Sequence, residues 1–256
     1  MHWSRYFFNA ERIGLRYFII AGIAFILFYF LLRKKIGYQK IQRQFPENKD
    51  YFREIRYSIG TIAIFALVPL VILPQIKKHT LFYTNIRQYG WFYFFLVFPL
   101  MFLIHDTYFY WAHRLMHHKK LFKLFHLVHH YSTNPSPWAA YSFHPLEAIV
   151  EAGIFVVFLF MIPIHPLHLG VFFLAMIIYN VYGHLGYELY LKGFSRHWIG
   201  RWINTSVNHN QHHQYFKGNY GLYFLWWDRW MHTIRNDYEE KYEAVKNIQE
   251  EKIEFK

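Results

Sequence analysis

Apolar residues occur in long runs along this chain, and polar residues are gathered in the segments between them. Five runs stand out, at residues 15–32, 57–76, 89–112, 146–163 and 166–187. Each approaches or exceeds the ~20 residues that an α-helix needs to cross the hydrocarbon core of a bilayer. The pattern predicts an all-α fold, namely a polytopic membrane helical bundle of about four to five transmembrane helices.

The distribution of lysine and arginine predicts how this bundle is oriented. Residues 33–56 carry eight of them, residues 77–88 carry three, and the turn at 163–166 carries none. Cytoplasmic loops are enriched in these residues, so we expect 33–56 to be cytoplasmic. Counting helices from there places the segments 113–130 and 209–213 on that same side. The formal net charge of +12 is spread over the ends of the apolar runs, which indicates a membrane protein and no nucleic-acid partner.

Histidine is unusually frequent, with 18 residues, whereas cysteine is absent. Without thiolates, any metal ion must be bound by imidazole or carboxylate groups. The histidines concentrate in three short segments: HRLMH at 113–117, HLVHH at 126–130 and HNQHH at 209–213. These segments carry the candidate chemistry of the sequence.

The first segment lies where the third apolar run ends. Asp106, Tyr110, His113 and His117 share one stripe of a helix, at about 100° per residue. Two imidazoles one turn apart can reach the same metal ion. We expect Asp106 and Tyr110 to support these ligands, because a carboxylate can orient a ligand imidazole through its second nitrogen.

The other two segments repeat the spacing His-x-x-His-His and add His126, His129, His130, His209, His212 and His213. The flanks of the first copy predict a short amphipathic helix on the membrane surface that ends at Asn134 and Pro135. Taken alone, each motif is also typical of a histidine-rich surface loop. Eight imidazoles on one membrane face instead suit two metal ions, with four or five nitrogen ligands each.

Two further histidines are candidates. His184 lies near the end of the last apolar run, with Glu188 one turn beyond it, and polar residues at membrane depth are usually functional. His144 lies just before the run at 146–163, with Glu147 beside it. We predict His184 as a metal ligand supported by Glu188 and treat His144 as a further candidate. For both histidines the alternative role is hydrogen bonding within the bundle.

The three segments, in this order and with apolar hairpins between them, resemble the fatty acid hydroxylase/sterol desaturase superfamily of membrane di-iron oxygenases. The resemblance covers roughly residues 90–233. It includes NPSPWAAYSFHPLE at 134–147, GHLGYE at 183–188 and NYGLYFLWWDRWMHT at 219–233, which are similar to segments of sterol-desaturase members. His232 stands where many members have glycine.

The resemblance implies two iron ions that activate dioxygen and hydroxylate a lipid C–H bond of fatty acid, sterol or sphingolipid type. All nine histidines predicted above would be ligands, and His144 remains an additional candidate. Electrons would come from a separate donor such as cytochrome b5, ferredoxin or a reductase. We expect the helices at 89–112 and 146–187 to line an apolar channel for the lipid.

The resemblance also suggests a division of the chain into three parts. Residues 1–88 would form N-terminal transmembrane helices and a basic loop, and residues 89–236 the catalytic domain. The polar tail at 237–256 would be a solvated helix or a frayed end.

Other functions are compatible with parts of this pattern. Desaturation at the same site is the nearest alternative, because both reactions begin with abstraction of a hydrogen atom. A zinc-binding membrane transporter or hydrolase belongs to another class. A transporter would place its ligands near the bilayer midplane, and a hydrolase would need a general base such as the glutamate of HExxH. A purely structural histidine-rich protein is the third alternative.

Overall fold

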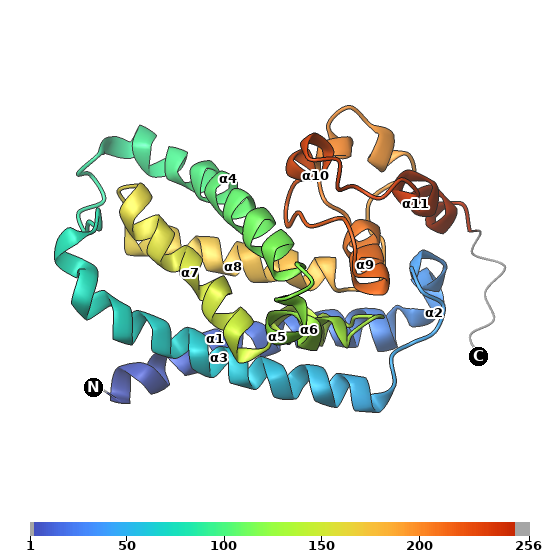
Figure 1. The fold of residues 1–256 in the computed structure, drawn as a ribbon, viewed down its shortest axis with the longest axis horizontal. Coiled ribbons are helices and arrows are strands. Elements are labelled where there is room, and N and C mark those ends of the chain that lie inside the picture. Colours follow the sequence, from blue (N-terminus) through green and yellow to red (C-terminus); the bar gives the residue numbers. More distant parts are fainter. Residues whose placement is uncertain (1–2, 249–256) are drawn as a thin grey trace.

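The computed structural model describes residues 3–248, which are largely helical and contain no strand beyond isolated bridges (Figure 1). The long helices are α1 (Trp3–Phe25), continued by a π-helical segment (Ile26–Leu31), α3 (Asn48–Ile76), α4 (Gly90–Met116), α7 (Pro145–Met161) and α8 (Pro166–Gly183). They lie together as a bundle, and the shorter helices cover one end of it.

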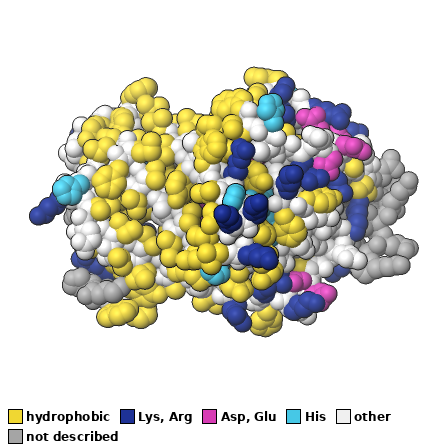
Figure 2. Space-filling model, viewed as in Figure 1, with side chains coloured by type: hydrophobic (Ala, Val, Ile, Leu, Met, Phe, Trp, Pro, Cys, Tyr) yellow, Lys and Arg dark blue, Asp and Glu magenta, His cyan; other side chains and the backbone are white. Residues whose placement is uncertain are grey.

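Four segments are long and apolar enough to cross a membrane: Trp3–Leu31, Asn48–Ile76, Gly90–Met116 and Pro166–Gly183. Helix α7 is also rich in apolar residues, but its 17 residues fall slightly short of the ~20 needed. Large apolar side chains cover the part of the surface formed by the long helices, while most charged side chains lie over the other part (Figure 2). The prediction of an all-α, multi-pass membrane bundle is confirmed.

The hairpin of α7 and α8 forms where the sequence predicts it. Pro145 and Pro166 begin the two helices, at the position where the missing proline N–H is not needed. The residues before them, His144 and His165, each accept a hydrogen bond from a backbone N–H of the first turn. His144 therefore caps a helix.

Apolar packing holds the long helices together in two places. One cluster joins α1 to α8 through Tyr17 and Ile177. The other joins α7 to α8 through Phe158 and Phe172. Lipid tails are as apolar as these side chains, so close van der Waals packing, and not transfer from water, holds the helices together.

The cap consists of α2 (Arg33–Ile36), α5 (Phe122–Phe125), α6 (Leu127–His130), α9 (Ser206–Tyr215), α10 (Trp226–Trp230) and α11 (Tyr238–Lys246). The prediction of a single amphipathic helix around the second histidine segment is wrong. The chain forms two single turns that meet at His126, and the second ends at His130, before Asn134. The break matters because His126 and His129 contribute to different histidine clusters.

The polar tail also differs from its prediction as a solvated segment. Helix α11 buries Tyr238, Tyr242 and Val245 in a cluster with Ile41 and Val207. Val207 belongs to α9, so the tail supports the helix that carries the third histidine segment. Residues 249–256 of the predicted tail lie outside the described range.

Candidate metal centre

Nine histidines meet where the bundle joins its cap. The five-His cluster contains His113, His117, His126, His130 and His212, and the four-His cluster contains His129, His184, His209 and His213. Within each cluster the candidate ligand nitrogens lie within 4.8 Å of one another. The clusters are neighbours, since the ring centroids of His130 and His213 are 5.1 Å apart. All nine predicted ligands are gathered here, and His144 belongs to neither cluster.

The spacing of the imidazole nitrogens fits a metal ion in each cluster. In the five-His cluster, the Nε2 atoms of His113 and His126 are 2.9 Å apart, and those of His130 and His212 are 3.0 Å apart. In the four-His cluster, Nε2 of His184 lies 3.0–3.2 Å from the Nε2 atoms of His129, His209 and His213. Two nitrogens bound at about 2.0–2.1 Å and at right angles are about 2.9 Å apart.

Hydrogen bonds at Nδ1, the ring nitrogen on the far side from the cluster centre, explain why the imidazoles point their Nε2 atoms inward. Backbone carbonyl oxygens accept hydrogen bonds from Nδ1 of His113 (Tyr220, 2.9 Å), His184 (Asn180, 2.8 Å) and His212 (Gly218, 2.7 Å). A carbonyl oxygen can only accept, so Nδ1 carries the proton and the Nε2 lone pair points toward the centre. This is the tautomer that binds a metal through Nε2.

Glu147 is the carboxylate that contacts a ligand directly. Its Oε1 lies 2.6 Å from Nδ1 of His126, and both side chains are buried. A carboxylate in this position orients the ring and makes it a stronger donor to the metal. In the segment around His144 and Glu147, the glutamate therefore acts on the centre, and the histidine does not.

Asp106 was predicted for that role, but it makes none of its described hydrogen bonds to an imidazole. It accepts from the backbone N–H groups of Tyr223 and Phe224, at 2.8 and 3.1 Å, and from the indole of Trp226 at 2.7 Å. Tyr110, similarly, shares a hydrogen bond with Thr233 at 2.9 Å. Both residues hold the segment that follows α9, and their spacing with His113 reflects one buried helix face.

Glu188 also acts through the backbone. It accepts hydrogen bonds from the N–H of Val207, at 3.0 Å, and from the hydroxyl of Tyr182, also at 3.0 Å. Val207 lies in the first turn of α9, where a negative charge stabilises the helix and satisfies a free N–H group. Glu188 thus positions the helix of His209, His212 and His213 without touching their rings.

Burial keeps the candidate ligands in their neutral form. It lowers the pKa of His184 to about 4. Burial, together with repulsion from neighbouring imidazoles, holds the pKa of His209, His212 and His213 well below the ordinary value. Neutral imidazole is the metal-binding form, so the site is ready for a cation at neutral pH.

We expect the apparent melting temperature of the metal-free protein to fall when the pH drops below about 6.5. An unfolded histidine takes up a proton near pH 6.5, whereas folded His184 does so only near pH 4. Between these values the unfolded chain binds more protons, so acid favours unfolding. The stabilisation is fully present above the unfolded pKa. Scanning fluorimetry of chelator-treated protein from about pH 7.5 to about pH 5 measures this, and a constant melting temperature would contradict it.

An apolar cavity of about 390 Å³ adjoins the four-His cluster. Its walls come from α4, α7 and α8, as the sequence predicts, and also from α1 and α3, which it did not indicate. At one end lies Phe143, whose ring is 5.2 Å from that of His129. His105 also lines the cavity, and its Nδ1 shares a hydrogen bond with the hydroxyl of Tyr223 at 2.9 Å. The volume is in the range of small-molecule sites.

Comparison with known proteins agrees with this architecture. The family model described as "Fatty acid hydroxylase" matches residues 98–233. A Delta(7)-sterol 5(6)-desaturase of Gibberella zeae is 33% identical over 91% of this chain and 71% of its own length. One of Aspergillus fumigatus is 29% identical over 81% and 69%, and the lathosterol oxidase of Homo sapiens is 27% identical over 75% and 64%. No solved structure matches the chain.

The family match covers all three histidine segments and spans more than half of the chain. The Gibberella relative extends the similarity into the first helices, since the alignment covers 91% of the residues. Together with the two histidine clusters at the end of an apolar bundle, these similarities assign the chain. It belongs to the fatty acid hydroxylase family and is a membrane-bound lipid oxidoreductase.

Proposed function

We propose that the protein is a di-iron lipid desaturase, and that a sterol-like lipid enters the cavity beside the four-His cluster. The similarity to Delta(7)-sterol 5(6)-desaturases and to lathosterol oxidase supports desaturation, the alternative left open by the sequence, over hydroxylation. The observation that carries the proposal is the position of the cavity beside the four-His cluster: Phe143 lines the cavity, and its ring centroid lies 5.2 Å from that of His129.

The donor set supports iron as the metal. Nine neutral imidazoles, with Glu147 behind His126, suit a divalent ion that prefers nitrogen ligands. Two iron ions bound there would supply the strongly oxidising chemistry of dioxygen that an unactivated C–H bond requires. The protein's own contribution is to fix the imidazoles through their Nδ1 acceptors, and to hold the lipid in an apolar space that excludes water.

The proposed reaction needs two electrons from outside, because loss of two hydrogens supplies only half of those that reduce dioxygen to water. We propose that the histidine clusters face the cytoplasm, where cytochrome b5, a ferredoxin or a reductase can reach them. Exposed lysines flank the histidine segments, at Lys119, Lys120 and Lys123 before the second segment and at Lys217 after the third. They support both the cytoplasmic orientation and an acidic donor.

Product analysis tests the proposed reaction. Purified protein reconstituted with iron and a reducing system would be incubated with lathosterol and, separately, with a total membrane lipid extract. We expect a product that lacks two hydrogen atoms in mass spectrometry, and none from His129→Ala. A product that has gained one oxygen atom would establish hydroxylation instead. Unchanged lipids in both incubations would contradict the proposed function.

A further inference from the structure

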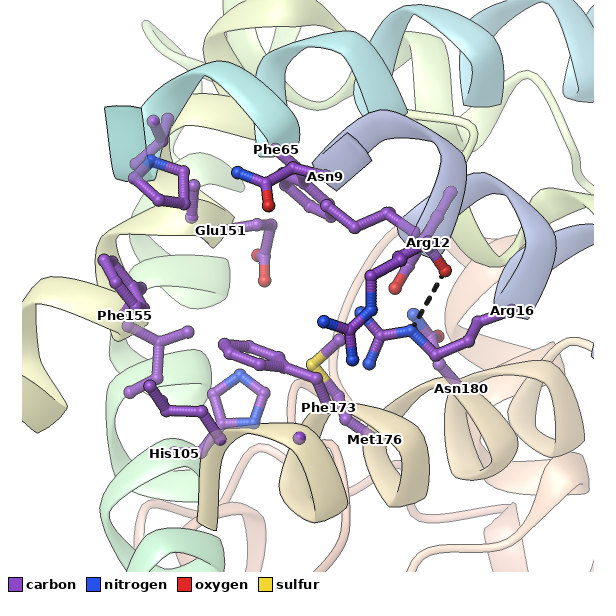
Figure 3. A pocket seen from close by; sticks show the side chains of 18 of the residues that line it. Asn9, Arg12, Arg16, Phe65, His105, Glu151, Phe155, Phe173, Met176 and Asn180 are labelled. Carbon is purple, nitrogen blue, oxygen red and sulfur yellow. Dashed lines mark hydrogen bonds between the residues drawn. The ribbon is translucent and has the colours of Figure 1, made fainter. Parts of the chain in front are cut away.

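The cavity is apolar except for a few groups, and ionisable side chains lie on its opposite walls. Arg12 and Arg16 line it from α1, and Glu151 lines it from α7. Figure 3 shows the two arginine side chains extending toward Met176 and Asn180 of α8, with the carboxylate of Glu151 on the other side. Ionisable residues inside a membrane-spanning segment are costly and therefore mark functional sites.

The two guanidinium groups have no acidic partner within residues 3–248. The contacts that involve them are a hydrogen bond from Nε of Arg16 to the carbonyl oxygen of Arg12, at 3.2 Å, and the ring of Phe8, at 5.3 Å from Arg12. They are one helical turn apart, so two like charges face the same space. Guanidinium groups stay protonated, and in an apolar environment they need a counter-charge. Among residues 3–248, no carboxylate forms an ion pair with either of them.

The exposed residues among those that line the cavity show where it opens to the surface. Three of the residues that line the cavity are also exposed on the surface: Arg12 of α1, and Pro166 and Gly170 of α8. The cavity therefore opens between α1 and the first half of α8. Arg12 lies at this opening, and the half-buried Arg16 lies one turn farther along α1. Both helices span the membrane, so the opening faces lipid.

We propose that the lipid substrate carries an anionic group, a carboxylate, sulfate or phosphate, which binds to Arg12 and Arg16. Guanidinium groups recognise such oxyanions by paired, charge-assisted hydrogen bonds. Glu151 lies on the opposite wall, so the pair of guanidinium groups places the anion on the side of α1. The uncharged part of the lipid then fills the cavity toward Phe143 and the four-His cluster. This inference rests on the proposed function for the chemistry that follows binding.

Paired probes that differ only in the polar group test the proposal. Equilibrium binding to the detergent-purified, metal-loaded protein would be measured for cholesterol sulfate against cholesterol, and for palmitate against palmityl alcohol. We expect the anionic member of at least one pair to bind at least about tenfold more tightly. The double substitution Arg12→Gln, Arg16→Gln should remove that preference. Arg5→Gln, on the same helix but outside the cavity, should keep it. Equal binding within both pairs, or a preference that survives the double substitution, would overturn the proposal.

A bilayer phospholipid headgroup offers the same chemistry at the opening, and a third variant separates the two sources. Gly170 has open space where a Cβ would lie, so Gly170→Trp can fold while its ring fills the opening. An anionic substrate inside the cavity should then bind at least about tenfold less tightly. Unchanged binding of the anionic probe would place the anion on the bilayer side and overturn the proposal.

The binding readout distinguishes this inference from the proposed reaction. If a neutral lipid alone is desaturated and the anionic probes bind no better, the function stands and the inference fails. If the anionic probe binds through the arginines and no lipid loses hydrogen, the inference stands and the proposed function fails.

Discussion

Replacing His184 with alanine should abolish lipid oxidation, with a loss of at least about a thousandfold, equivalent to about 4 kcal/mol in the activation free energy. His184 is the shared neighbour of the four-His cluster, since its Nε2 lies 3.0–3.2 Å from three other Nε2 atoms. Its loss leaves three imidazoles and removes the nitrogen that lies close to all of them. We therefore expect the protein to lose about one of the two proposed iron ions per chain. Metal analysis and product formation on the same preparation measure both effects.

The matched control for this variant is His144→Ala. Sequence reasoning treats both histidines as candidate ligands, but the structure gathers only His184 into a cluster, while His144 caps α7. Loss of the cap should cost about 1 kcal/mol of stability and leave the iron content unchanged. Full iron content in His184→Ala, or iron loss in His144→Ala, would contradict the assignment of the two roles.

The two histidine clusters could be predicted from the sequence because the spacing of the histidines carries the information. Residues three and four apart on a helix share a face, and the repeated His-x-x-His-His pattern is unlike a chance arrangement. The apolar runs predicted the long helices for a similar reason, since the bilayer thickness sets their length. Both signals are local in the sequence, so a single sequence is sufficient to detect them.

Contacts between distant segments leave no such local signal. Arg12 and Arg16 look like the polar edge of an apolar run, and only the packing of α1 beside α8 turns them toward the cavity. Glu147 and His126 are brought together in the same way, by a turn between their elements. Asp106 illustrates the opposite error. Its place on the histidine stripe suggested a bond to an imidazole, whereas its partners lie more than a hundred residues away, at 223–226.

Removing the carboxylate of Asp106 should destabilise the folded protein. Asp106→Ala should lower the free energy of unfolding by about 3 kcal/mol, because it leaves one buried and two half-buried N–H donors without an acceptor. The segment held by these bonds includes Tyr220, whose carbonyl accepts from His113. Loosening it should therefore also lower the iron content of the five-His cluster. The apparent melting temperature and the iron content measure the two consequences.

Two further variants separate this structural role from direct action on the metal. Asp106→Asn keeps an acceptor oxygen for the backbone of Tyr223 and Phe224 but turns an amide N–H toward Trp226, so its loss of stability should be intermediate. Asp237→Ala removes only a partly exposed pair with Arg235, at 3.0 Å, and should change stability by less than about 1 kcal/mol. If Asp106 instead oriented a ligand, iron would be lost while the melting temperature stayed near that of the wild type. We expect the melting temperature and the iron content to fall together, because the carboxylate stabilises the backbone on which the ligands depend.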